Sequence, residues 1–260
     1  MTPLIHPMFA ANAAVYAIQN ATVEGKATVI ALLVLSLFSW TIIITKFRQL
    51  NIARKAAKKF FAAYASTRDP LDIKKRGEDF DGAPAFELYD RGAEELAYQL
   101  KNNPVTVKGE RRISPSSFEA VKVVLEEAAA TQAMALEKGM IVLSTAVAGG
   151  PFIGLLGTVW GVMSTFAGIA DSQAATLTAM APGVAAALVA TVTGLLVAIP
   201  AMFAYNFMVT TIRAITQELD GFATRYANQI EHTYVDNRDI EDKIAWALTR
   251  VEMGENTPAI

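Results

Sequence analysis

Cysteine is absent from this sequence, and histidine occurs only twice. The absence of cysteine excludes disulfide bonds, thiolate nucleophiles and cysteine-ligated metals. His6 and His232 lie far apart along the chain, and a zinc site needs three or four ligands, so neither is expected to bind a metal. No nucleophile, base or metal cluster can be assembled from the other residues. We therefore predict no catalytic residue, no metal, no cofactor and no enzymatic activity.

Charge is also scarce. Charged residues make up 18% of the chain and hydrophobic residues 53%, and the net charge is −2 at pH 7. A chain this close to neutrality gives no indication of a nucleic-acid partner. The basic runs at 54–55, 58–59 and 74–76 are expected to face water or lipid headgroups.

Ionisable residues are missing from long stretches of the chain. Residues 27–45 are uncharged, and Asp171 is the only aspartate, glutamate, histidine, lysine or arginine between Lys138 and Arg213. About 20 apolar residues suffice for a helix to cross a bilayer. The predicted transmembrane helices are 27–45, 139–170 and 183–209, and a short loop at 171–182 joins the last two.

A cleaved signal peptide is the competing interpretation of residues 27–45. This stretch begins deep in the chain, and Glu24 precedes it. Lys46 and Arg48 follow it as they would follow a stop-transfer segment. We therefore predict an uncleaved first span.

Lysine and arginine are distributed unevenly around the three spans. Of 23 such residues, one precedes the first span, none lies between the second and third, and 17 lie between Lys46 and Lys138. Because basic residues stay on the cytoplasmic side, we predict a periplasmic N-terminal segment (1–26) and a cytoplasmic C-terminus. The chain is then a multi-pass protein of the bacterial inner membrane.

The segment 46–138 reads as a cytoplasmic helical region. Helix breakers at 69–70, 82–84, 102–104 and 109 leave two short amphipathic segments, 71–80 and 85–100. Ser114 is expected to cap a helix that begins at Pro115 and runs unbroken into the second span.

A helical extension is predicted at 210–235, followed by a C-terminal helix and tail at 236–260. Apolar residues of the extension recur at spacings of three and four, which predicts one buried stripe that packs between subunits. The stripe consists of Ile212, Ile215, Leu219, Phe222, Tyr226 and Ile230. The predicted fold class is an all-α integral membrane protein with three transmembrane helices and long cytoplasmic helical extensions.

Small residues form a seam along the second span and another along the third. The first seam is Gly150, Gly154, Gly157, Gly161, Ser164 and Gly168; the second is Gly183, Ala187, Ala190, Gly194, Ala198 and Ala201. In lipid, small residues let helix backbones approach closely, so the seams predict a tight helical hairpin. A tight hairpin does not by itself define a function.

Threonine provides the polar groups of these spans, with Thr158 and Thr165 on the second and Thr191 and Thr193 on the third. Two interpretations stay open. Each hydroxyl can bond to a carbonyl one turn back, or the hydroxyls can line a narrow path for a cation or water. Because no ionisable residue lies within the apolar parts, any titrating carboxylate must come from another subunit.

Two long motifs carry a resemblance to a known family. Residues 151–163, with the sequence PFIGLLGTVWGVM, and residues 181–191, APGVAAALVAT, resemble the family of ExbB, TolQ and MotA very closely. The sequences Gly194-Leu195 and Ala198-Ile199-Pro200-Ala201 continue the second motif, and SWTIII at 39–44 is similar to the TolQ branch.

The resemblance implies an ion-driven, energy-transducing motor. Five copies of the chain would surround two copies of a single-span partner similar to ExbD or TolR, whose membrane aspartate carries the ion. A transducer similar to TonB or TolA would receive the work. Thr158 and Thr191 match the pore-facing threonines of the family. The small residues, together with Pro182, would pack subunits closely or face the partner.

One departure concerns Ala186, where ExbB and TolQ usually have glutamate. A proton remains the expected ion, and sodium held by the oxygens of Thr158, Thr191 and Thr193 is the alternative. A flagellar or gliding stator, a self-contained channel and a passive scaffold are the other functions that the residues leave open.

Overall fold

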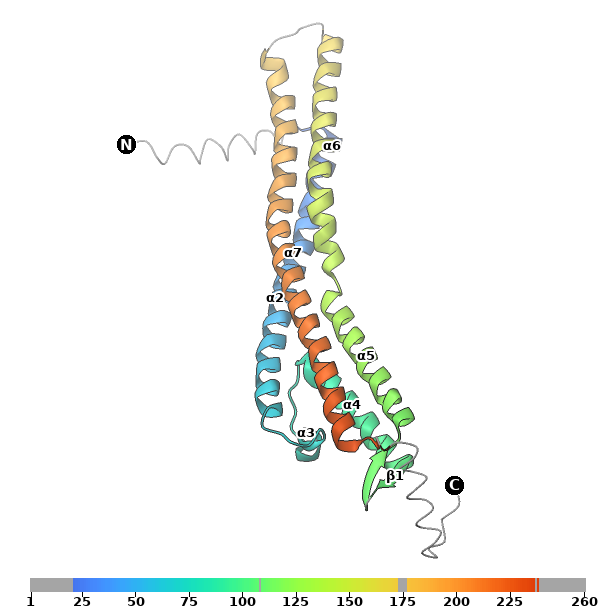
Figure 1. The fold of residues 1–260 in the computed structure, drawn as a ribbon. Coiled ribbons are helices and arrows are strands. Elements are labelled where there is room, and N and C mark those ends of the chain that lie inside the picture. The colour runs from blue at the N-terminus through green and yellow to red at the C-terminus, as the bar shows by residue number, and fades with distance from the viewer. Residues whose placement is uncertain (1–20, 108, 173–176, 237, 239–260) are drawn as a thin grey trace, which may run out of the picture. The chain divides into compact units, whose positions relative to one another are not determined.

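The computed structural model describes residues 21–107, 109–172, 177–236 and 238. Almost all of these residues are helical, and the order of elements can be followed in Figure 1. The elements are α2 (Val23–Tyr64), α3 (Asp72–Arg76), α4 (Pro84–Asn102), β1 (Pro104–Val107), β2 (Glu110–Ile113), α5 (Pro115–Glu137), α6 (Met140–Ser172) and α7 (Leu177–Tyr234).

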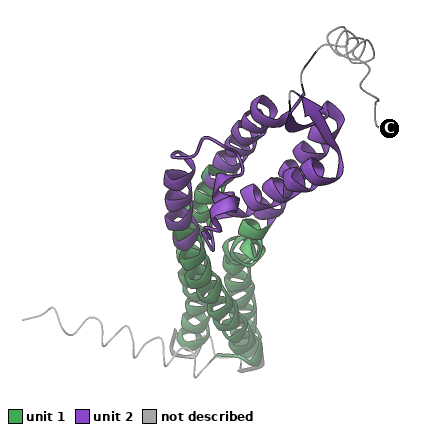
Figure 2. Ribbon diagram, turned by 90° about the horizontal axis from the view of Figure 1, so that it is seen from below, with its two compact units in different colours: residues 1–51, 135–214 green, residues 52–134, 215–260 purple. Residues whose placement is uncertain are grey.

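The chain forms two compact units, drawn in different colours in Figure 2. We call residues 1–51 and 135–214 the span unit, and residues 52–134 and 215–260 the extension unit. Within the described part of the chain, three helices are long and apolar enough to cross a membrane, in Val23–Tyr64, Met140–Ala170 and Met180–Tyr234. The predicted all-α membrane fold with three spans is confirmed.

The predicted unbroken helix from Pro115 into the second span is wrong. The helix α5 ends at Glu137 and α6 begins at Met140, because Gly139 adopts a left-handed backbone conformation with φ of 87°. The Lys46 ammonium on α2 donates hydrogen bonds to the carbonyl of Leu136 at 3.0 Å and to that of Ala135 at 3.4 Å. A buried lysine thus stabilises the carbonyl end of α5.

Two other boundaries of the spans also differ from expectation. The predicted loop at 171–182 is wrong at both of its ends, because α6 continues to Ser172 and α7 begins at Leu177. Pro182 therefore lies inside a helix. The predicted third span and the extension at 210–235 form one continuous helix. The C-terminal helix and tail expected at 236–260 lie outside the described residues except for Asp236 and Arg238, as does most of the segment 1–26.

In the extension unit, the breakers separate elements as predicted. The segment 71–80 contains α3, which ends at Gly77 with φ of 65°, and the segment 85–100 lies within α4. Ser114 caps α5, since its Oγ accepts a hydrogen bond from the backbone N–H of Ser117 at 3.1 Å.

A small β-structure was not anticipated. Strands β1 and β2 pair antiparallel, with Val107 opposite Glu110, and Gly109 lies at the turn with φ of 86°. Val235 forms a parallel bridge to Ile113 just after α7 ends. The helix breakers around this segment are also compatible with a hairpin, because a glycine can adopt the left-handed conformation that a tight turn between two strands requires.

The apolar stripe of α7 is buried inside the chain. Phe222 packs on Phe60 of α2 with ring centroids 5.3 Å apart, and Tyr226 packs on Tyr89 of α4 at 5.1 Å. Leu219 and Ile230 are also buried. The predicted packing of this stripe between subunits is therefore wrong, because α2 and α4 of the same chain already cover it.

A polar cluster around Asp69 joins the loop after α2 to the end of α7. The Asp69 carboxylate accepts hydrogen bonds from the Leu71 N–H at 2.9 Å and from the Tyr234 hydroxyl at 2.8 Å, and it pairs with Lys75. Burial of the carboxylate opposes ionisation. The Lys75, Leu71 and Tyr234 bonds outweigh that effect and hold the pKa of Asp69 below its ordinary value.

We predict that Asp69→Asn lowers the free energy of unfolding by about 1–3 kcal/mol at pH 7, because charge-assisted hydrogen bonds are lost. A depressed pKa stabilises the fold above the unfolded value of about 3.9, and this contribution disappears as the pH falls through the lower folded value. Denaturant unfolding in detergent should therefore show a gap between wild type and Asp69→Asn that narrows below about pH 4. The exposed Asp81→Asn is the control, and an equal loss in both variants would contradict the prediction.

Candidate functional site

The candidate site begins with the close approach of α6 and α7, which run side by side in the span unit (Figure 1). A methyl group built on Gly194 would lie 2.6 Å from the carbonyl oxygen of Gly150. One built on Gly154 would lie 3.0 Å from the carbonyl oxygen of Ala190. Only glycine lets the two backbones come this close without a shift.

Outward along α6, the small residues pack against two helices at once. A methyl group on Gly157 would lie 2.6 Å from Ala190 Cβ on α7 and 2.8 Å from Thr28 Oγ1 on α2. One on Gly161 would lie 2.8 Å from Ala187 Cβ. The first span therefore joins the hairpin at Gly157. Gly168, at the outer end of the seam, has open space around its Cβ position.

The close backbones bring two predicted site residues together. The hydroxyls of Thr158 and Thr191 are hydrogen-bonded to each other, and both lie near the carbonyl oxygen of Gly154, at 3.1 and 3.3 Å. Each hydroxyl has one hydrogen, so one donates to the carbonyl while the other donates to its neighbour. The same cluster thus contains a hydrogen bond from a hydroxyl to the carbonyl one turn back and a hydrogen bond between hydroxyls of the second and third spans.

The two other predicted threonines are not part of this pair. Thr165 donates to the Gly161 carbonyl at 2.8 Å, and Thr193 donates to the Val189 carbonyl at 2.8 Å. Successive residues of a helix are 100° apart, so Thr193 points about 200° around α7 from Thr191. A single ion cannot be held by both side chains.

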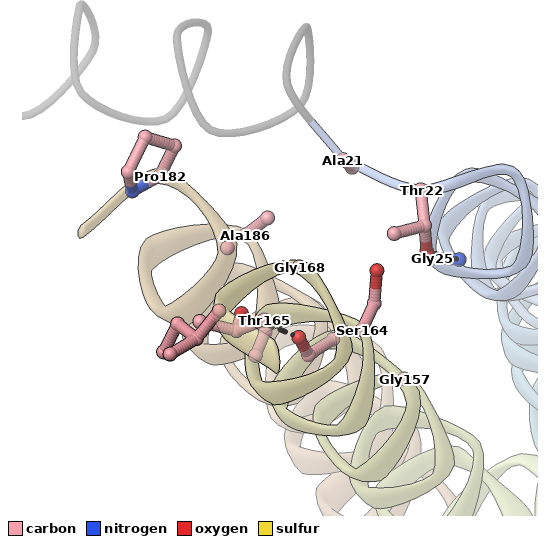
Figure 3. Close-up of a pocket in the computed structure, with 13 residues that line it drawn as sticks. Ala21, Thr22, Gly25, Gly157, Ser164, Thr165, Gly168, Pro182 and Ala186 are labelled. Carbon is pink, nitrogen blue, oxygen red and sulfur yellow. Dashed lines mark hydrogen bonds between the residues drawn. The ribbon is translucent and has the colours of Figure 1, made fainter. Parts of the chain in front are cut away.

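A cavity of about 300 Å³ lies at the outer end of the bundle, and Figure 3 shows it in close-up. Its walls come from the start of α2, from α6 and from α7, and most of them are glycine and alanine. The hydroxyl-bearing residues of the lining are Thr22, Ser164 and Thr165, and the lining also includes Gly168, Pro182 and Ala186.

The inner end of this outer cavity approaches the threonine pair. Gly157, next to Thr158, lines the cavity, and so does Ala187, one turn from Thr191. The backbone at Gly183 lies against Thr165, since a methyl group there would collide with the Thr165 hydroxyl. The outer cavity, with hydroxyl-bearing residues among its mostly small lining, therefore extends from the ends of the helices to within about one turn of the threonine pair.

Sequence reasoning missed the contribution of Thr22 to this cavity. Thr22 precedes the first span, and its Oγ1 accepts a hydrogen bond from the Gly25 N–H at 3.1 Å, as a helix cap does. A threonine followed three residues later by glycine and then by an apolar run is the signal that could have located it.

The chemistry of the site is that of hydroxyls and carbonyls. Among the described residues, no three histidine, cysteine, aspartate or glutamate side chains gather into a metal-binding group. Hydroxyls can donate and accept protons and solvate a cation, but they do not ionise near neutral pH. The arrangement suits a polar passage between helices.

Comparison with known proteins defines the class. Residues 97–221 match the model of the MotA/TolQ/ExbB proton channel family. The biopolymer transport protein ExbB of Pseudomonas putida is 34% identical over 75% of this chain, which spans only 56% of that relative's length. The Tol-Pal system protein TolQ of Haemophilus influenzae is 31% identical over 80% of this chain and 89% of its own. TolQ of Pseudomonas aeruginosa is 32% identical over 73% of this chain and 80% of its own length.

These matches and the three apolar helices define a multi-pass protein of the inner membrane. The chain belongs to the MotA/TolQ/ExbB proton channel family, and the resemblance found in its motifs is confirmed. The family is described as one of proton channels, and membership together with the ExbB and TolQ relatives supports an ion-driven, energy-transducing role in the cell envelope.

We predict that Gly194→Ala destabilises the protein by about 1–3 kcal/mol, because the new methyl group meets the backbone of Gly150 and the helices must separate. Thermal unfolding in detergent would measure this loss. The control is Gly149→Ala, which points into open space and gains helix propensity. Equal melting temperatures for the two variants would refute close packing at Gly194.

Proposed function

We propose that this chain is the multi-copy subunit of a motor driven by the ion-motive force, with ExbB/TolQ-like organisation. Five copies surround two copies of a single-span partner similar to ExbD or TolR, and a transducer similar to TonB or TolA receives the work. The observation that carries the proposal is the Thr158–Thr191 hydroxyl pair beside a cavity partly lined by hydroxyls, in a helical hairpin whose apolar parts contain no carboxylate, histidine, lysine or arginine.

The absence of a carboxylate in these spans is why a partner is needed. A moving proton must rest on a group that titrates near neutral pH, and no aspartate, glutamate, histidine, lysine or arginine lies between Lys138 and Asp171 or between Asp171 and Arg213. In the proposed complex, the partner's aspartate is that group. The outer cavity admits water toward it. As one oxygen of the threonine pair accepts a proton from this water, its own hydrogen passes to the neighbouring oxygen, whose hydrogen is in turn released toward the aspartate.

The proton is the better candidate for the translocated ion. A sodium site built from Thr158, Thr191 and Thr193 would need all three oxygens on one side. Thr193 instead bonds to its own helix and faces away from Thr191. Ala186 lines the outer cavity beside hydroxyls, so water can occupy the position where the family usually has a glutamate.

The orientation that fits the motor has the N-terminus and the outer cavity in the periplasm and the extension unit in the cytoplasm. The distribution of lysine and arginine supports this orientation. Ions would then enter at the outer cavity and leave on the cytoplasmic side of the membrane.

We predict that Thr158→Val and Thr191→Val each reduce ion flux by about tenfold, the equivalent of one lost hydrogen bond. Flux is to be measured in membrane vesicles that contain the chain with its partner. Thr158→Ser keeps the hydroxyl and should retain flux. Thr210→Val is the matched control, because the Thr210 hydroxyl is exposed and bonds only to its own helix.

The same vesicles test the ion and the role of the pair. Flux that persists in sodium-free medium is expected for a proton path, and flux that requires sodium would refute it. Unchanged flux in both valine variants, with normal thermal stability, would make the threonine pair structural and favour a passive scaffold.

We further predict a complex of five copies with two partners in native mass spectrometry after co-expression with a single-span, aspartate-bearing protein. The partner's carboxylate supplies the group that this chain lacks, so flux should require it. A stable homo-oligomer that conducts ions without any partner would instead support a self-contained channel.

A further inference from the structure

A second cavity, of about 360 Å³, lies at the opposite end of the span unit from the outer cavity. It lies between the junction of α5 with α6 on one side and α7 on the other. Its lining includes Glu137, Ile141, Ser144, Tyr205, Val209 and Arg213. We call it the inner cavity. The motor proposed above assigns no role to it.

The inner cavity lies where the uncharged stretches of the chain are flanked by charged residues. Apart from Asp171, Arg213 is the first residue after Lys138 that is charged at neutral pH. Tyr205 lies two turns before Arg213 on α7, and tyrosine is enriched at the boundary between hydrocarbon and headgroups. The cavity therefore joins an apolar half, with Ile141 and Val209, to a charged half.

The two charges of the inner cavity are opposite and unpaired. Among the described residues, neither Glu137 nor Arg213 has an ion-pair or hydrogen-bond partner, although both line the same cavity. The Ser144 hydroxyl donates to the Ile141 carbonyl at 2.9 Å, so only its acceptor lone pairs are free. A ligand that carries both a cation and an anion would satisfy this lining.

We propose that the inner cavity binds the headgroup of a zwitterionic aminophospholipid from the cytoplasmic leaflet. The phosphate contacts the Arg213 guanidinium and the Tyr205 hydroxyl, and the ammonium contacts the Glu137 carboxylate. One acyl chain runs along Ile141 and Val209. A volume of about 360 Å³ lies within the range of small-molecule sites and is suited to a headgroup rather than to a whole lipid.

Charge complementarity favours this ligand over an anionic lipid or free phosphate. An anionic lipid would satisfy Arg213 but would leave Glu137 facing a like charge. Free phosphate would leave the apolar half in water. The proposal requires a membrane protein, which family membership provides. Its choice of leaflet rests on the orientation proposed above, but it does not depend on the motor function.

The test uses the purified full-length protein after delipidation in detergent. Native mass spectrometry counts lipids retained when phosphatidylethanolamine or phosphatidylglycerol is added. Wild type should retain about fivefold more phosphatidylethanolamine than phosphatidylglycerol, which is the effect expected of one partly screened charge contact. Glu137→Gln should abolish that preference, and Arg213→Gln should weaken the retention of both lipids.

Lys138→Gln and Glu127→Gln are the matched controls, since both side chains are exposed and neither lines the inner cavity. They should bind as wild type does. Equal retention of the two lipids by wild type, or wild-type binding by Glu137→Gln and Arg213→Gln at normal thermal stability, would overturn the proposal. Competition by inorganic phosphate at equal concentration would also overturn it, because the site would then recognise only the anion.

Discussion

The contact between the backbones of α6 and α7 is the constraint on which the site depends. Gly150, Gly154 and Gly194 remove the side chains that would otherwise hold the helices apart. In lipid, burial of apolar surface does not drive helices together, so close packing and hydrogen bonds between helices must do so. The Thr158–Thr191 bond forms because the backbones are already close, and it adds a polar contact to an otherwise apolar interface.

The extension unit is held together by a different balance of forces. In water, burial of aromatic rings is favourable in itself, and Phe60, Tyr89 and Phe222 provide such a core. Tyr89 keeps its proton, since burial raises its pKa to about 12. Its hydroxyl accepts a hydrogen bond from the Lys74 N–H at 3.1 Å, so the polar group of this buried side chain has a partner.

The two units therefore suit a protein that has both a membrane part and a water-exposed part. The span unit contributes cavities at both ends and a hydroxyl pair between them. Its outer helix faces remain apolar, with exposed side chains such as Leu37, Phe152 and Leu196, as expected where lipid or neighbouring subunits cover them. The site consequently depends on the close backbone contacts and the cavities that small residues allow, rather than on large functional side chains.

The sequence alone determined the three spans, the seam of small residues, the approximate extents of α3 and α4 and the start of α5. These features are local: hydropathy, three- and four-residue spacing, and capping residues such as Ser114 are readable without a partner. The tertiary structure decided which surfaces meet. It placed Thr158 against Thr191 but turned Thr193 away, brought Thr22 to the outer cavity, and covered the α7 stripe with rings of the same chain. Periodicity identifies a face that must be buried, but the partner of that face depends on long-range packing, which no local pattern encodes.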